Sequence, residues 1–195
     1  MEILSLGTRI RRGAARALRN LVLILIFICS GCLIPGQREV IPSLEVTSPA
    51  FPDGGQIPVN HTCDGANRSP PLAWGPVPSG TAALAIIVTD TDAPGGSFLH
   101  WGVYNIPPAT GSIPAGGTAQ SILPAGSIQA TNDFGRAGYG GPCPPRGMPH
   151  HYHFTVYALD SPVNPAGARD GRRLLGALEG HTLARGEIVG IYQRA

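Results

Sequence analysis

The sequence lacks an internal repeat, a nucleophile elbow and any recognisable hydrolase motif. The missing repeat excludes solenoids and propellers, and the missing motifs argue against a hydrolase. Charge is also scarce, since 13% of the 195 residues are charged. The formal charge of +2 becomes −2 when residues 1–31, which carry five Arg and one Glu, are set aside. The remainder therefore lacks the basic surface of a nucleic-acid-binding protein.

The first 31 residues have the pattern of an export signal. A segment with five arginines precedes an apolar run over residues 21–28, and the small residues Ser30 and Gly31 stand before Cys32. This order predicts a bacterial lipoprotein signal with lipid on Cys32. The alternative is an uncleaved N-terminal anchor, because no charge lies between Arg19 and Arg38. Both place the rest of the chain outside the cytoplasm, tethered to the membrane in the periplasm or on the cell surface.

The remaining 164 residues are enough for one domain with a sizeable core. We expect a tether over residues 32–45 and a domain over residues 46–195. The chain holds 27 Gly and 20 Pro, which predicts many loops, and its 43% hydrophobic content is that of a globular protein.

Short apolar runs separated by turns dominate the predicted domain. Strands are expected at residues 82–89, 100–105, 154–159 and 187–192, with a short edge strand at 57–59. One helical period occurs, over residues 169–183, and Gly180 is its expected stop. The pattern predicts an all-β fold, a sandwich or barrel with a short late helix.

Three histidines gather where a loop rich in Gly and Pro meets the strand that follows it. Successive side chains of a strand face opposite ways, so His150 and Tyr152 share one face while His151 and His153 share the other. Only one of these pairs can line a given pocket. The alternative is an edge strand whose histidines are simply solvated.

Two cysteines remain after Cys29 and Cys32 are assigned to the signal and the lipid. In an oxidising compartment Cys63 and Cys143 can form a disulfide that closes a loop of 80 residues. Two separately buried thiols are the alternative, because a sequence does not show the distance between Cα atoms.

Several motifs in a fixed order strongly resemble the phosphatidylethanolamine-binding protein family, in its bacterial and archaeal branch described as Raf-kinase-inhibitor-like. They are CDGANRSPPLAW at Cys63 to Trp74, DTDAP at Asp90 to Pro94, HWGVYNIP at His100 to Pro107, NDFGRAGYGGPCPP at Asn132 to Pro145, HHYHFTVYALD at His150 to Asp160 and EGHTLARGEIVGIYQR at Glu179 to Arg194. The resemblance covers residues 46–194. It implies a Greek-key sandwich of two antiparallel sheets with a small anion pocket at one end.

The resemblance also implies a ligand-binding role and a set of site residues. The expected pocket holds Asp90, His100, His150 and Tyr152, bordered by Asp92, Ala93, Pro94, Gly140, Gly141 and Pro142. Family members bind phosphate-like or carboxylate anions there, including the phosphoethanolamine head group of a phospholipid. We therefore expect a non-catalytic binding protein without a cofactor. Asp90 is expected to fix the tautomer of a histidine and to favour its protonated form, and the alternative is that it accepts from a protonated phosphate.

Three features depart from the family pattern. Thr91 stands where Pro is usual, and His151 stands where Arg is common. The chain also lacks the C-terminal helix of the animal members, so their kinase regulation is not carried over. Family members often form dimers, and a homodimer is the corresponding expectation for this chain.

Two other functions compete with anion binding. One is inhibition or regulation of an exported protease or other enzyme through protein contact, as parts of the family do. The other is a metal-dependent enzyme that uses His151 and His153, which lie two residues apart on one strand face. A third metal ligand is hard to assign from the sequence.

Overall fold

The computed structural model describes residues 41–116 and 122–195. These residues belong to one compact unit, Ile41–Ala195. The predicted signal over residues 1–31, the lipidation at Cys32 and most of the expected tether lie outside the described residues. Within the described ranges, no helix is long and apolar enough to cross a membrane.

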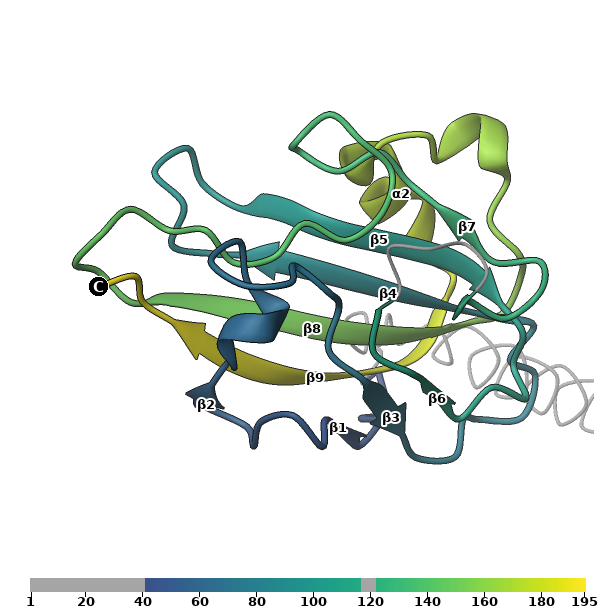
Figure 1. Ribbon diagram of the computed structural model, residues 1–195. Coiled ribbons are helices and arrows are strands. Elements are labelled where there is room, and N and C mark those ends of the chain that lie inside the picture. The colour runs from purple at the N-terminus through teal and green to yellow at the C-terminus, as the bar shows by residue number, and fades with distance from the viewer. Residues whose placement is uncertain (1–40, 117–121) are drawn as a thin grey trace, which may run out of the picture. The chain divides into compact units, whose positions relative to one another are not determined.

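Two β-sheets form the body of the domain (Figure 1). The larger sheet has the order β2 (Gly55–Gln56), β9 (Thr182–Tyr192), β8 (His150–Leu159), β4 (Ala83–Asp90), β5 (Phe98–Ile106) and β7 (Ile128–Gln129). The smaller sheet has the order β1 (Val46–Thr47), β3 (Leu72–Trp74) and β6 (Ser112–Ile113). The all-β prediction is confirmed.

The apolar run of β4 explains why it lies at the centre of the larger sheet. Residues 83–88 are all buried, as is expected of a strand that is covered on both faces. One face packs under the smaller sheet in a core that includes Ile86, Val88 and Trp101. The other face includes Ile87 and packs under helix α2 (Gly171–Leu178) in a second core. Figure 1 shows the smaller sheet and α2 on opposite sides of the larger sheet.

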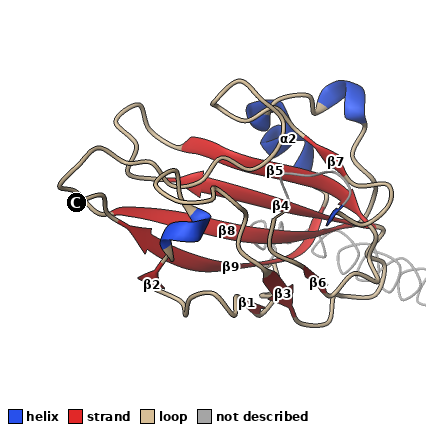
Figure 2. Ribbon diagram, viewed as in Figure 1, coloured by secondary structure: helices blue, strands red, loops and turns tan. Residues whose placement is uncertain are grey.

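Helix α2 (Gly171–Leu178) is amphipathic and capped. The Asp170 side chain accepts a hydrogen bond from the Arg173 N–H at the first turn, and Leu174 and Leu178 are buried. Gly180 adopts a φ of +77°, which few other residues tolerate, and it follows the end of the helix. The predicted helix over residues 169–183 is therefore present but shorter than expected. A 3-10 turn, η3 (Pro165–Gly167), precedes it (Figure 2).

The predicted edge strand at residues 57–59 is wrong. Pro58 has no N–H, and the chain turns after it into the 3-10 helix η1 (Val59–His61). The extended pair lies just before it, in β2, which runs parallel to β9. This pairing departs from the otherwise antiparallel pattern of the larger sheet. Nearer the start of the domain, the N–H of Arg185 on β9 donates to the Pro42 carbonyl at 3.0 Å.

Candidate functional site

Three neighbouring strands bring the predicted site residues to one end of the larger sheet. Asp90 is the last residue of β4, and it lies opposite Tyr152 on β8 and Phe98 on β5. His150 and Tyr152 are buried whereas His151 is exposed. This confirms that the two buried residues share a face of β8.

Asp90 and His150 form a buried pair. The Nδ1 atom of His150 lies 2.8 Å from Oδ2 of Asp90, and both side chains are about 95% buried. The other carboxylate oxygen accepts a hydrogen bond from the Asp92 N–H at 2.9 Å. Because an ionised carboxylate only accepts, this contact places a proton on Nδ1 of His150. Asp90 therefore holds the Nδ1 proton of His150 and leaves Nε2 for other partners.

His100 reaches the same region from β5. Its Nδ1 lies 2.6 Å from the carbonyl oxygen of Gly140, which can only accept, so Nδ1 is the donor. Burial lowers the pKa of His100, and the Gly140 carbonyl and the Asp90 charge oppose this only in part. The ring is therefore neutral at pH 7, and its Nε2 is an acceptor.

The hydroxyl of Tyr152 is buried without a hydrogen bond. It lies close enough to the Asp90 carboxylate and the Cys143 backbone for both to affect its pKa, but it forms a well-aligned hydrogen bond with neither. Burial, together with the negative charge of Asp90, raises the pKa of Tyr152, so the phenol stays protonated. An unsatisfied buried hydroxyl is costly, and such a group in a native protein calls for a missing partner.

A cavity of about 200 Å³ opens over these groups. Its lining consists of Asp90, Ala93, Pro94, Phe98, His100, Phe134, Cys143, Pro144, Pro145 and His150. The structure thus brings five of the ten expected residues to the cavity wall. Tyr152 lies behind the wall, against the His100 ring at 5.2 Å between centroids. Asp92, Gly140, Gly141 and Pro142 support the wall instead of lining it.

Sequence reasoning missed the aromatic side of this cavity. Phe98 and Phe134 pack edge to face with each other and with His100, at centroid distances of 4.8 to 5.2 Å. Phe98 lies two residues before His100, so the alternation of a strand could have placed both side chains on one face. Phe134 comes from a distant loop, and no spacing in the sequence indicates its contact with them.

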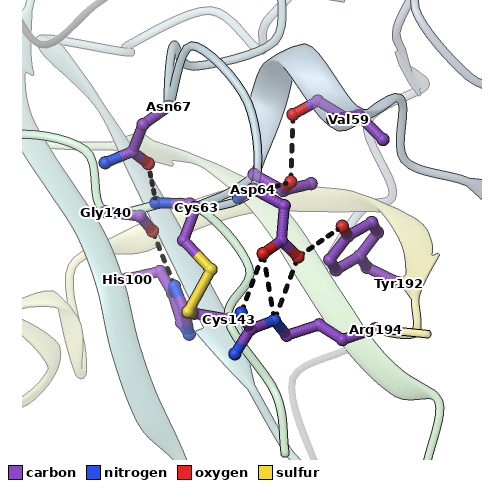
Figure 3. The surroundings of a disulfide bond; sticks show 11 residues. Val59, Cys63, Asp64, Asn67, His100, Gly140, Cys143, Tyr192 and Arg194 are labelled. Atoms are coloured by element: carbon purple, nitrogen blue, oxygen red, sulfur yellow. Dashed lines mark hydrogen bonds and ion pairs between the residues drawn. A yellow bond between two sulfur atoms is a disulfide. The ribbon is translucent and has the colours of Figure 1, made fainter. Parts of the chain in front are cut away.

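A disulfide braces the loop that carries the cavity's prolines. Cys63 and Cys143 are bonded (Figure 3). The N–H of Cys63 also donates to the carbonyl of Pro142 at 3.0 Å. We call residues 59–68 the strap. Asp64 on the strap is held by Arg194 and by the Tyr192 hydroxyl at 2.8 Å. These contacts join the cavity loop, the strap and the end of β9 into one unit.

Loop amides near the cavity already have partners. The N–H of Gly140 donates to the His100 carbonyl at 3.0 Å, and the N–H of Gly141 donates to Oδ1 of Asn67 at 2.7 Å. A Cβ on Gly141 would lie 2.6 Å from that Oδ1 and from the carbonyl oxygen of His61, so only glycine fits against the strap. These two glycines therefore shape the wall and do not offer their amides to a ligand.

Most of the chain matches one known protein family. Residues 47–193 match the family model described as phosphatidylethanolamine-binding protein. The chain belongs to the phosphatidylethanolamine-binding protein family. Membership of this family supports a protein that binds a ligand.

Relatives of this phosphatidylethanolamine-binding protein occur in archaea and bacteria. A UPF0098 protein of Pyrococcus horikoshii is 44% identical over 173 residues, which cover 87% of this chain and 85% of that protein. LppC of Mycobacterium tuberculosis, provisionally named a lipoprotein, is 43% identical over 75% of this chain and 73% of its own length. The crystal structure of Escherichia coli YbcL, described as a member of the mammalian PEBP family, matches with a TM-score of 0.74 and 39% identity. The match covers 78% of this chain and 99% of that one.

The outer histidines of β8, His151 and His153, do not line the cavity. His151 contacts Asp92 at 2.8 Å and His153 contacts Glu187 at 3.3 Å, so each has its own carboxylate partner. Hydrogen bonds from His151 are also the main cause that lowers the pKa of Asp92. Among the described residues, no three His, Cys, Asp or Glu side chains are placed to hold one metal ion.

Proposed function

We propose that this protein binds a small phosphate-like anion, such as the phosphoethanolamine head group of a phospholipid, in the cavity between β4, β5 and β8, and does so without catalysis. The observation that carries the proposal is the Tyr152 hydroxyl, which is fully buried and lacks a hydrogen-bond partner in the described part of the chain. An anion oxygen would supply the acceptor that this donor lacks.

The Asp90–His150 pair supports the same role. With Nδ1 held by Asp90, a protonated His150 presents Nε2–H as a second donor, and the carboxylate balances the ring's charge. The ligand then meets a charge-assisted donor at one end of a cavity whose other walls are largely proline and phenylalanine, and the Tyr152 phenol lies directly behind the wall. The volume suits a head group and does not enclose acyl chains.

Replacing Tyr152 by Phe tests this proposal through two opposite effects. We expect the affinity for phosphoethanolamine and for inorganic phosphate to fall about tenfold, because a hydrogen bond to a charged ligand is lost. The unliganded variant should be more stable by about 1 kcal/mol, because an unsatisfied buried hydroxyl is removed without a change of shape. Calorimetric titration and urea unfolding measure the two effects.

Tyr157→Phe is the matched control, since Tyr157 lies on the same strand but outside the cavity. It should leave anion affinity unchanged. If the folded wild type binds neither anion, the proposal is wrong and the family fold has been kept for another purpose. Equal affinity in Tyr152→Phe and wild type would also contradict it.

We further propose that the protein is exported and anchored through lipid on Cys32. The signal pattern and the name of LppC support this proposal. Labelling cells with a palmitate analogue should mark the wild-type protein, and Cys32→Ala should abolish the label. Equal labelling of both proteins would contradict lipidation at this residue. The homodimer remains a prediction from the family resemblance.

A further inference from the structure

His100 gives the cavity an acceptor where an anion site is expected to hold donors. The Gly140 carbonyl takes the Nδ1 proton of the ring, at 2.6 Å, and only Nε2 is left for a ligand. His100 is 97% buried, and its ring packs edge to face against Phe98, Phe134 and Tyr152. Neither phenylalanine supplies a charge that would stabilise an imidazolium.

The charged and titratable groups around His100 come from three elements. Asp90 on β4 and Asp133 in the loop after β7 both act to raise the pKa of His100, and burial outweighs them. On β8, His150 is already paired with Asp90, and Tyr152 stays protonated. Asp133 is engaged elsewhere, because its Oδ2 accepts from the Leu99 N–H at 2.7 Å. The Gly140 and Gly141 backbone also raises the pKa of His100, but burial remains the largest cause, so a neutral His100 is the form that its surroundings favour.

In the described part of the chain, the glycines and prolines around the cavity offer no free N–H group near Nε2 of His100. The amides of Gly140 and Gly141 are used within the protein, and Pro94, Pro144 and Pro145 on the wall have no N–H. The cavity wall therefore offers the ligand an acceptor at Nε2 of a neutral His100, beside the Asp90–His150 pair. A fully ionised oxyanion leaves that Nε2 facing a lone pair.

We infer that the site selects oxyanions that carry their own acidic hydrogen, such as singly protonated phosphate monoesters, because His100 accepts the O–H of the ligand. Sulfate monoesters have the same shape and the same single charge but no such hydrogen, so the site discriminates against them. This inference rests on the proposed function and specifies the ligand's protonation state. His100 is its specificity-determining residue.

Methyl phosphate and methyl sulfate are the matched probes. By calorimetric titration at pH 6, we expect methyl sulfate to bind the wild-type protein at least about tenfold more weakly, because it leaves a buried acceptor unpaired. Affinity for methyl phosphate should fall as the pH rises above about 6, where the ester loses its second proton, by up to about tenfold per pH unit. Titrations at pH 8 in buffers of different ionisation enthalpy should show uptake of about one proton.

His100→Asn assigns the effect to one atom. The Asn amide can still donate to the Gly140 carbonyl, but it offers no acceptor at the position of Nε2. The variant should lose most of the preference for methyl phosphate over methyl sulfate. A preference retained in the folded variant would overturn the assignment to His100.

The wild-type titrations alone separate the possible failures. Equal affinity for the two esters, without proton uptake, would overturn this inference and leave the anion-binding function standing. Proton uptake with both esters would place the proton on a cavity histidine, His100 or His150, instead of on the ligand, and would also overturn it. Binding of neither ester would overturn the inference together with the proposed function.

Discussion

Replacing both Cys63 and Cys143 by serine should lower the free energy of unfolding by about 4 kcal/mol. The disulfide joins residues 80 positions apart, and on the loop-entropy model a closed loop of that length removes a large part of the unfolded chain's freedom. Anion affinity should fall too, because Cys143 is part of the cavity wall and the strap is its support. Urea unfolding and calorimetric titration measure the two consequences.

Two hydrogen bonds between the strap and the cavity loop remain in the double variant and should keep the two segments together. The Cys63 N–H bond to Pro142 and the bond from Gly141 to Asn67 do not depend on sulfur. We therefore expect the variant to fold and to bind more weakly, not to lose its structure. A loss of less than about 1 kcal/mol would show that native-state strain or residual structure in the unfolded chain offsets the entropy.

Asp90→Asn should weaken anion binding by about tenfold to a hundredfold. The site uses both carboxylate oxygens as acceptors, one for His150 Nδ1 and one for the Asp92 N–H. An asparagine has a single oxygen, so its amide N–H must face one of these two donors. Either the tautomer of His150 or the position of the loop after β4 is lost, and a charge-assisted hydrogen bond of this kind contributes about 1.5–3 kcal/mol.

Asp160→Asn is the control for the loss of an Asp–His contact as such. Asp160 Oδ1 lies 2.9 Å from His181 Nδ1, in a pair that is about half exposed and is not part of the cavity. Its replacement should leave the affinity for phosphoethanolamine unchanged. Unchanged or tighter binding in Asp90→Asn would mean that the negative charge of Asp90 opposes the ligand more than its hydrogen bonds assist it.

Local patterns predict the long elements of this fold well. The strands around β4 and β8 are continuous or alternating apolar runs, whose burial follows from their composition, and the alternation along β8 places His150 and Tyr152 on the buried side. The shorter elements depend on partners far away in the chain. β2 is extended because β9 lies beside it, while Pro58 ends the ladder one residue after Ile57.

The site could be predicted only as far as its motifs reach. Asp90, His100 and His150 stand in recognisable motifs, and the structure places them together. The sequence does not predict the roles of Gly140 and Gly141. Whether a loop amide faces a ligand or a neighbouring loop depends on tertiary contacts, such as the hydrogen bond from Gly141 to Asn67. The contact of Phe134 with His100 likewise depends on how a distant loop folds back.

The chain enters the domain at the end of β9 that lies away from the cavity. Pro42 and Leu44 bond to Arg185 near the start of β9, whereas the cavity residue His150 lies opposite Tyr192 at the other end of the same strand. Seven residues of strand separate the two points, about 23 Å. The proposed lipid attachment at Cys32 would therefore hold the domain by the end of β9 that lies away from the cavity.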